Sequence, residues 1–158
     1  MKWIRLKQKI LLSLVLKIPY SKIRVWALRE AGFKVGKEVY VGDGISLAVG
    51  FGDPDMKLIL QDRVSIGPNV TIVLVSHSNY SPLTTVFYLH KYKKILINEG
   101  AWIGAGAIIL PGVSLGRYCV VGAGSVVTRN VADYTIVAGN PTRVLRVLDE
   151  NKLNDSKY

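Results

Sequence analysis

Aliphatic residues recur at every sixth position through the second half of the chain, at Ile97, Ile103, Ile109, Leu115, Val121 and Val127. A period of six does not fit an amphipathic α-helix, which repeats about every 3.6 residues, or a plain hairpin strand. We therefore expect each hexad to form a short strand and a turn, with one aliphatic side chain pointing inward. Three hexads would close a coil of about 18 residues, and stacked coils would bury columns of these side chains.

The same register occurs upstream, at Val35, Val41 and Leu47 and again at Leu60, Ile66 and Ile72. Small or modest side chains stand two positions before the later repeat residues: Ala101, Ala107, Val113, Cys119 and Ser125. Glycine follows several repeat residues directly, and glycine permits a tight corner without a Cβ clash. The pattern predicts an all-β solenoid of parallel strands, and the spacing alone does not give its handedness.

Residues 78–94 interrupt the repeat. They contain Asn, Ser, Pro, several aromatic residues and three lysines, and the repeat resumes at Ile97. We expect an excursion loop that leaves the solenoid at one corner, and loops carried by a rigid scaffold commonly shape binding sites. The chain then divides into an N-terminal segment (1–34), a β-solenoid domain (35–137) and a C-terminal tail (138–158).

The N-terminal segment has a helical pattern instead. Its apolar residues fall on one helical stripe: Trp3, Ile4, Ile10, Leu11, Leu14, Val15 and Ile18. Pro19 ends that helix, and a shorter second helix is expected from Ser21 to Ala31, stopping at Gly32. The stripe either caps the open end of the solenoid or lies on a membrane interface, and the pattern alone favours neither alternative.

Most of the positive charge lies in this segment. The whole chain carries +10, and residues 1–34 hold nine Lys and Arg against Glu30 alone, a net +8. Such a segment suggests phosphate, anionic lipid or nucleic acid as a partner. Nucleic acid is disfavoured because only the charge suggests it, and the stretch has few aromatic residues for base stacking.

Compartment signals are few. No apolar run approaches the roughly 18 residues that a membrane-spanning helix needs, and no signal-peptide cleavage pattern follows residues 10–16. The single cysteine, Cys119, excludes an internal disulfide. We expect a cytoplasmic protein that contacts the inner face of the membrane peripherally, through residues 1–34.

Four segments of the chain resemble the hexapeptide-repeat acetyltransferases. They are NEGAWIGAG (98–106), LPGV (110–113), VGAGSVVT (121–128) and VAGNPTRV (137–144). The resemblance is greatest to the sugar O-acetyltransferases related to maltose and galactoside acetyltransferase and to capsule and O-antigen enzymes. REAGFKVG (29–36) also resembles the entry to the capsule-type members. The resemblance implies a left-handed parallel β-helix, a homotrimer, and acetyl-CoA held in the groove between neighbouring subunits.

Acetyl transfer to a hydroxyl needs a base, because an alcohol is a poor nucleophile at neutral pH. Histidine suits this role, with an unperturbed pKa of about 6.5. The chain has two, His77 and His90. His77 occupies the position of the family's catalytic histidine, just before the excursion loop, and we predict that it is the base. Asp53, Asp55 or Asp62 could orient it, although each is also a natural turn or surface carboxylate.

The resemblance also assigns cofactor contacts. Ala105 matches the backbone N–H donor to the oxyanion, Trp102 matches the aromatic residue beside the cofactor arm, and Ala123 lets the pantetheine approach the backbone. CoA carries several phosphate charges, which cationic side chains would meet. The residues that match the family's contacts to the nucleotide end are Thr128, Arg129, Arg143 and Arg146.

The acceptor side departs from the family pattern. Leu47 stands where the galactoside enzyme has a sugar-binding asparagine, so a free galactoside or maltose is in doubt as the acceptor. Asn79 and His90, in or near the excursion loop, are the candidate acceptor contacts. We expect O-acetylation of a cell-surface polysaccharide precursor. An amino-sugar N-acetyltransferase and a non-catalytic nucleotide-sugar binding scaffold are the alternatives. No metal is expected, since two histidines are too few for a three-histidine zinc site.

Overall fold

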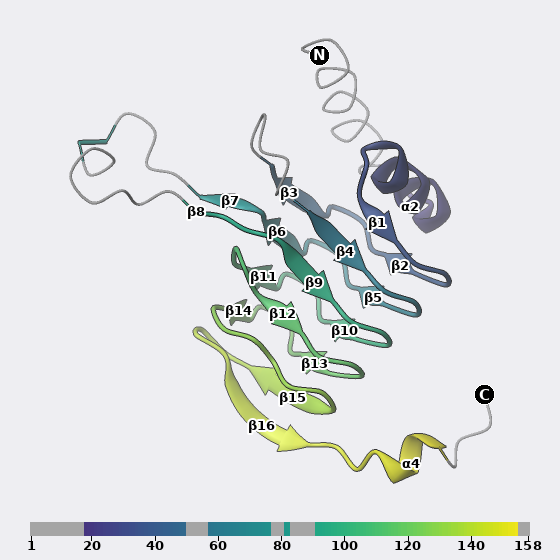
Figure 1. The fold of residues 1–158 in the computed structure, drawn as a ribbon, viewed down its shortest axis with the longest axis vertical. Helices are drawn as coiled ribbons and strands as arrows, with labels where there is room; N and C mark the ends of the chain where they lie inside the picture. Colours follow the sequence, from purple (N-terminus) through teal and green to yellow (C-terminus); the bar gives the residue numbers. More distant parts are fainter. Residues whose placement is uncertain (1–17, 50–56, 77–80, 83–90, 155–158) are drawn as a thin grey trace.

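The computed structural model describes residues 18–49, 57–76, 81–82 and 91–154 (Figure 1). The helices are α2 (Ser21–Glu30) and α4 (Asn151–Asn154). The strands are β1 (Lys34–Val35), β2 (Tyr40–Val41), β3 (Ser46–Ala48), β4 (Leu58–Leu60), β5 (Ser65–Ile66), β6 (Thr71–Val73), β7 (Val75–Ser76), β8 (Lys91–Tyr92), β9 (Ile95–Ile97), β10 (Trp102–Ile103), β11 (Ile108–Ile109), β12 (Ser114–Leu115), β13 (Val120–Val121), β14 (Val126–Val127), β15 (Thr135–Ala138) and β16 (Arg143–Val147).

The strands build three sheets that the chain visits in rotation. Sheet A has the order β1-β4-β9-β12, sheet B the order β16-β15-β13-β10-β5-β2, and sheet C the order β14-β11-β6-β3. Each circuit of the chain adds one strand to A, then to B, then to C, and neighbouring strands within each sheet are parallel except β15 and β16. The predicted solenoid of parallel strands is therefore confirmed, and Figure 1 shows its coils stacked along one axis.

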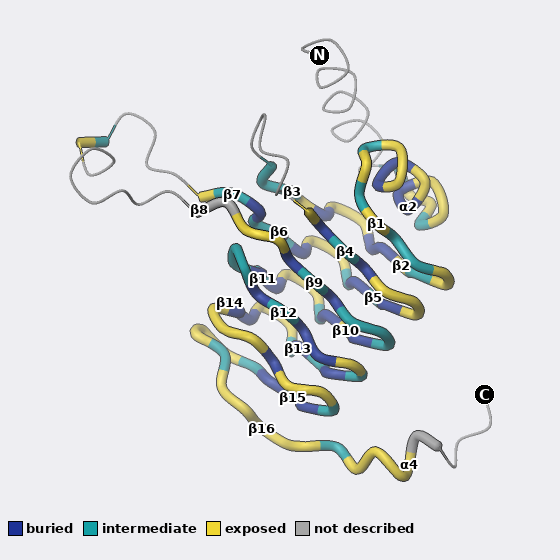
Figure 2. Tube along the Cα trace, viewed as in Figure 1, coloured by how far each residue is buried: buried dark blue, intermediate teal, exposed yellow. Residues whose placement is uncertain are grey.

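The repeat residues lie opposite one another from coil to coil. In sheet B the register pairs Val41 with Ile66, Ile66 with Ile103, Ile103 with Val121 and Val121 with Val137. Sheets A and C stack their repeat residues in the same way. The small residues two positions earlier point inward too and are buried: Ala101, Ala107, Val113, Cys119 and Ser125. These two inward rows form the core that runs along the inside of every coil (Figure 2).

Two insertions lengthen the early coils. From Ile97 to its partner Leu115 one coil takes 18 residues, whereas 37 separate Leu60 from its partner Ile97. The extra residues leave after β7 and return through β8, and these two strands pair antiparallel, with Ser76 opposite Lys91. An excursion therefore leaves and re-enters the coil at one point, as the sequence predicted. A smaller insertion, between β3 and β4, includes residues 50–56, which lie outside the described residues.

Separate elements cover the two ends of the coil stack. At one end α2 packs on β1 and β2 and buries Val25, Ala27 and Leu28. Its bounds confirm the predicted second helix, which ends before Gly32. The predicted first helix, in residues 1–17, lies outside the described residues. At the other end β16 turns back along β15. No helix in the described ranges combines the length and apolar character that crossing a membrane requires.

Candidate functional site

The corners between sheets A and B carry large, interlocked side chains. We call this column the aromatic corner; its residues are Asp62, Arg63, Glu99, Gly100, Arg117, Tyr118, Asp133 and Tyr134. The rings of Tyr118 and Tyr134 stack with their centroids 5.5 Å apart. Arg63 pairs with Glu99, and its Nη2 donates to Tyr118 Oη at 2.9 Å. These polar and aromatic groups are therefore occupied with one another from coil to coil.

Asp133 anchors the last step of this column. Its Oδ1 accepts from the Arg117 backbone N–H at 2.7 Å and its Oδ2 from Arg117 Nε at 2.9 Å. These hydrogen bonds, that of the backbone N–H first, lower the pKa of the Asp133 carboxyl. Burial and a hydrogen bond to Glu150 raise the pKa of Tyr134. The aromatic corner thus consists of mutually satisfied surface contacts.

The corners between sheets B and C are bare by contrast. We call the residues Gly104-Ala105-Gly106 and Gly122-Ala123-Gly124 the glycine corner. The two turns stack directly, because Gly124 N–H donates to Ala105 O at 2.8 Å, and Gly106 N–H donates to Pro68 O of the preceding coil at 2.8 Å. Within the part of the chain that the structure describes, the N–H groups of Ala105 and Ala123 donate to no other group. The glycine corner therefore offers two backbone N–H groups without partners among the described residues, in turns whose largest side chain is a methyl group.

Backbone conformation favours glycine at positions 106 and 124, but packing does not require it. Both have left-handed backbones, with φ of +67° and +65°. The matching positions at the aromatic corner hold Tyr118 and Tyr134 at φ of 52° and 55°, and Asn69 holds the matching place in the coil before Gly106, at 56°. A Cβ at Gly106 or Gly124 would meet nothing within 4 Å. These two glycines keep the corner open to a group that approaches from outside.

At Gly104, close packing explains why the residue is glycine. A Cβ there would lie 2.6 Å from the Ala123 backbone nitrogen, so the tight stacking of coils requires glycine. The same holds for Gly67, whose Cβ would lie 2.8 Å from the Ala105 nitrogen. The glycine corner thus combines glycines that close packing requires with glycines that have a left-handed backbone and open space outside them.

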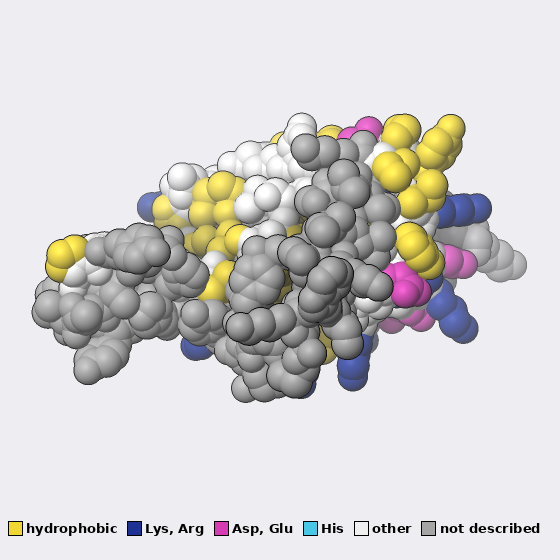
Figure 3. Space-filling view, turned by 90° about the horizontal axis from the view of Figure 1, so that it is seen from above, with side chains coloured by type: hydrophobic (Ala, Val, Ile, Leu, Met, Phe, Trp, Pro, Cys, Tyr) yellow, Lys and Arg dark blue, Asp and Glu magenta, His cyan; other side chains and the backbone are white. Residues whose placement is uncertain are grey.

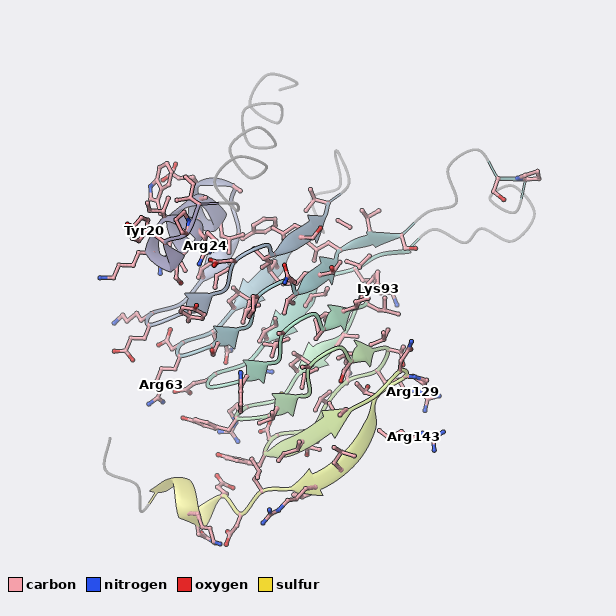
Figure 4. The ribbon with its side chains drawn as sticks, turned by 180° about the vertical axis from the view of Figure 1, so that it is seen from behind. Tyr20, Arg24, Arg63, Lys93, Arg129 and Arg143 are labelled. Carbon is pink, nitrogen blue, oxygen red and sulfur yellow. The ribbon has the colours of Figure 1, made fainter. Side chains whose placement is uncertain are left out.

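Of the predicted cofactor residues, Ala105 and Ala123 form this corner and Trp102 lies next to it, whereas Thr128 and Arg129 lie at the opposite end of sheet C. Trp102 lies on β10, two residues before Gly104, and is 57% exposed. Thr128 and Arg129 follow β14 in sheet C, whereas Arg143 and Arg146 lie on β16 and are exposed. Figure 4 shows Arg129 and Arg143 on one side of the molecule, with Lys93 farther along it and Arg63 of the aromatic corner on the opposite side.

The predicted base and acceptor contacts lie beyond what the structure describes. His77, Asn79 and His90 are outside the described residues, and Ser76, at the end of β7, is the last described residue before His77. Asp53 and Asp55 are outside them as well. Asp62 is a turn carboxylate: it lies at the aromatic corner and accepts the Lys37 backbone N–H at 2.8 Å.

Leu47 is partly buried at the edge of the core. It lies opposite Ile72 in sheet C and packs against the buried cluster. Cys119 is a core residue, and burial raises the pKa of its thiol to about 12. Among the described residues, no group of three His, Cys, Asp or Glu side chains could hold a metal ion.

The glycine corner and the start of the excursion loop lie at opposite ends of sheet C. Gly106 stacks on Pro68, which precedes β6, and the chain leaves toward His77 only after β6 and β7. The strands between them, β6 and β11, are paired side by side. Within one chain, Ala105 and Ser76 are therefore separated by the width of sheet C.

Sequence reasoning missed two features of this region. It did not separate Gly106 and Gly124 from the glycines that the turns require, because that distinction depends on φ and on the space around a Cβ. It also counted Lys93 only as part of the loop, although Figure 4 places it on the side that carries Arg129 and Arg143. The lysines at residues 91, 93 and 94, where the loop re-enters the coil, were the available signal.

Comparisons with known proteins give one consistent result. Residues 94–129 match the family described as bacterial transferase hexapeptide (six repeats). The galactoside O-acetyltransferase of Lactococcus lactis is 38% identical over 125 residues, which cover 78% of this chain and 57% of that protein. The Bacillus subtilis protein YvoF is 31% identical over 147 residues, which cover 91% of this chain and 78% of YvoF. This chain thus spans less than two thirds of the Lactococcus protein.

The fold has close counterparts among solved structures. A hexapeptide-repeat-containing acetyltransferase from Vibrio cholerae O1 biovar eltor, solved in complex with acetyl coenzyme A, superposes with a TM-score of 0.71 at 26% identity. The superposition covers 94% of this chain and 89% of that one. The coil described above is therefore shared with a structure that holds acetyl-CoA.

Proposed function

Since the chain belongs to the hexapeptide-repeat acetyltransferase family, we propose that it is an acetyl-CoA-dependent O-acetyltransferase acting on a sugar hydroxyl. The observation that carries the proposal is the glycine corner, where Ala105 and Ala123 present unused N–H groups beside open space at Gly106 and Gly124. A thioester carbonyl and the arm behind it are a ligand that needs both close backbone approach and hydrogen-bond donors.

The Ala105 N–H has the role of the oxyanion donor. When an alcohol attacks the acetyl thioester, negative charge develops on the carbonyl oxygen, and a fixed N–H aimed at that oxygen stabilises the transition state more than the ground state. The Ala123 N–H, one coil farther, is available to the pantetheine amides, and the exposed ring of Trp102 would cover the arm.

His77 has the role of general base. It takes the proton from the acceptor hydroxyl as the oxygen attacks the acetyl carbon, and the proton then returns to the leaving CoA thiolate. Such proton transfer contributes roughly 10²–10⁴ in rate. Support for this role comes from the position of His77, immediately after β7 and before the excursion.

The cationic edge, by which we mean Thr128, Arg129, Arg143 and Arg146, would hold the phosphates of CoA. Arg129 and Arg143 share one side of the molecule (Figure 4), and Thr128 and Arg146 belong to the same stretches of chain. Charge-assisted hydrogen bonds from arginine to phosphate are short and strong compared with neutral ones. These residues would bind the nucleotide end, away from the reacting carbonyl.

A homotrimer completes the proposed site. Ala105 and the start of the excursion loop lie at opposite ends of sheet C, so one chain does not bring His77 and Ala105 together across that sheet. A neighbouring copy placed against this face would supply the His77 that faces Ala105. The left-handed sense of the coil belongs to the same proposal, and the superposition on the Vibrio cholerae structure supports it.

The acceptor is proposed to be a precursor of a cell-surface polysaccharide, acetylated in the cytoplasm, with Asn79 and His90 as its contacts. Leu47 is partly buried against the core, and its side chain offers no polar group to a small free sugar. That observation favours a larger acceptor whose recognition depends on the excursion loop.

The test is an acetyl-transfer assay with acetyl-CoA and a panel of acceptors: free galactoside and maltose, amino sugars, nucleotide sugars and lipid-linked glycans. CoA release and the mass of the product are followed together. We expect an alkali-labile O-acetyl ester on a glycan, and a His77→Ala variant that binds acetyl-CoA normally but reacts about 10²–10⁴ times more slowly.

Three outcomes would overturn parts of the proposal. Full activity in the His77→Ala variant would remove the base. An alkali-stable amide product would make the chain an amino-sugar N-acetyltransferase. Failure to bind acetyl-CoA in calorimetry, together with binding of a nucleotide sugar, would make it a non-catalytic scaffold.

A further inference from the structure

Helix α2 has two unlike faces. The inner face buries Arg24, Val25, Ala27 and Leu28 against the first coil. The outer face exposes Ile23 (37%) and Trp26 (50%), and Tyr20, next to the start of the helix, is 67% exposed. These three residues are spaced by three along the chain, so they gather on one side of the helix. We call them the α2 outer face.

The α2 outer face is held in a fixed position. Arg24 is 1% exposed, and its guanidinium donates from Nε to Val41 O at 2.9 Å and pairs with Asp43 at 2.7 Å. Ser21 Oγ accepts the Val41 backbone N–H at 2.9 Å. The partners of these two α2 residues, Val41 and Asp43, lie in the first coil. Figure 4 labels Arg24 and Tyr20. The apolar outer residues are thus presented by a docked helix.

Charged side chains lie near this face, and in the sequence of residues 1–34 most of them are positive. Lys22 and Arg29 are exposed on α2, and Glu30 is the single acidic residue among residues 1–34, against nine Lys and Arg. Lys2, Arg5, Lys7, Lys9 and Lys17 precede the helix in the sequence. Figure 3, which looks onto this end of the coil, shows hydrophobic side chains with Lys, Arg and acidic side chains beside them.

We infer that the α2 outer face rests on the surface of an anionic lipid bilayer. Aromatic side chains favour the boundary between headgroups and acyl chains, and Lys and Arg are attracted to anionic headgroups. Tyr20, Ile23 and Trp26 would supply the apolar contact and Lys22 the positive charge, whereas the Arg29 guanidinium donates to Val35 O and Gly36 O of the first coil. A second copy fits this face less well, because pairing two such faces would bring their cationic side chains together.

The alternatives for the apolar stripe from Trp3 to Ile18 remain predictions, because residues 1–17 lie outside the described residues, but α2 would combine the two roles. Capping the coil and contacting a membrane are compatible, since α2 uses opposite faces for each. The inference is independent of the acetyl-transfer chemistry, and it would keep the coil close to an acceptor carried on a lipid.

The test uses Trp26 as its own reporter. In full-length protein carrying Trp3→Phe and Trp102→Phe, Trp26 is the single tryptophan. Vesicles of phosphatidylcholine with phosphatidylglycerol should shift its emission to the blue, and brominated acyl chains should quench it. Vesicles of phosphatidylcholine alone should do neither, and raised salt should reverse the effect. A protein that retains only Trp102, through Trp3→Phe and Trp26→Phe, is the matched control and should show no quenching.

Partitioning of variants between buffer and anionic vesicles then tests the α2 outer face. Ile23→Ser combined with Trp26→Ser should weaken binding to the anionic vesicles by about tenfold or more. Leu145→Ser, which removes an equally exposed apolar side chain from β16 at the far end, should leave it unchanged. Cosedimentation with vesicles without quenching of Trp26 would assign lipid contact to residues 1–17 and overturn the inference. A blue shift of Trp26 that depends on protein concentration and needs no lipid would overturn it in favour of self-association.

Discussion

The aromatic corner and the glycine corner are built on the same turn, repeated along opposite edges of sheet B. Both place a residue in the left-handed region, with φ between 52° and 67°. At the aromatic corner that residue is Arg63, Tyr118 or Tyr134, whose side chains contact one another from coil to coil, or Gly100, where a Cβ would meet the Tyr118 ring. At the glycine corner it is Gly106 or Gly124, with nothing near its missing Cβ. The turn therefore accepts large side chains as well as glycine, and the glycine corner differs in leaving the space outside the turn open.

The difference separates scaffold from function. Side chains at the aromatic corner satisfy one another through ion pairs, a ring stack and hydrogen bonds, which fits a solvated edge of the solenoid. At the glycine corner, backbone N–H groups are left without partners among the described residues. Such N–H groups cost little free energy while water solvates them, and they can donate hydrogen bonds to a ligand with carbonyl oxygens.

The largest effect should follow from removing one N–H. Ala105→Pro deletes the proposed oxyanion donor. The turn should accept proline, because Pro68 holds the same place one coil earlier and packs as closely on Gly42 as Ala105 does on Gly67. We expect kcat for acetyl transfer to fall by about 10²–10³. Ala123→Pro should instead raise KM for acetyl-CoA. Equal kcat in the wild type and the Ala105→Pro variant would remove Ala105 from the chemistry.

A smaller effect should follow from filling the open space. Gly106→Asn should fold normally, since Asn69 has the same backbone conformation in the coil before. Its side chain would occupy the path of the cofactor arm, so we expect acetyl-CoA to bind about tenfold more weakly, a loss of about 1.4 kcal/mol. Calorimetry measures this directly. As a control, Glu38→Asn places asparagine at a left-handed residue of another corner and should leave the affinity for acetyl-CoA unaltered.

The cationic edge should contribute less. Arg143 is exposed, so the Arg143→Ala variant would lose only a solvent-screened contact with phosphate. We expect its affinity for acetyl-CoA to fall about threefold to tenfold at low salt. The loss should shrink as ionic strength rises. With S-acetylpantetheine, which lacks the nucleotide, the variant and the wild type should bind alike. An equal loss with both ligands would argue against a phosphate contact.

The aromatic corner should affect stability slightly and acetyl transfer not at all. Because the folded-state pKa of Asp133 is lowered, its contribution to stability is present above the unfolded value of about 3.9 and is lost as pH falls through the folded value. Asp133→Asn should therefore lower the melting temperature by a few degrees at neutral pH. The difference from the wild type should close in acid. A difference that grows toward low pH would contradict this sign.

The sequence predicted the scaffold well because the hexad repeat is a packing constraint. Every repeat residue from Ile97 to Val127 faces the core, and α2 begins and ends where the helical pattern placed it. The aromatic corner was hidden, since its ring partners are 16 residues apart where the last coil is shorter than 18. The role of Gly106 was hidden too, because every corner of the repeat offers glycines. The roles of His77, Asn79 and His90 remain predictions from the sequence.

The position of bound CoA tests the account most directly. In a crystal structure of the full chain with CoA, we expect the pantetheine arm to run along Gly106 and Gly124, with the sulfur near the Ala105 N–H and His77 of a neighbouring copy beside it. The phosphates should lie toward Arg129 and Arg143. CoA bound at the aromatic corner, or along a single copy with the glycine corner empty, would contradict the central claim.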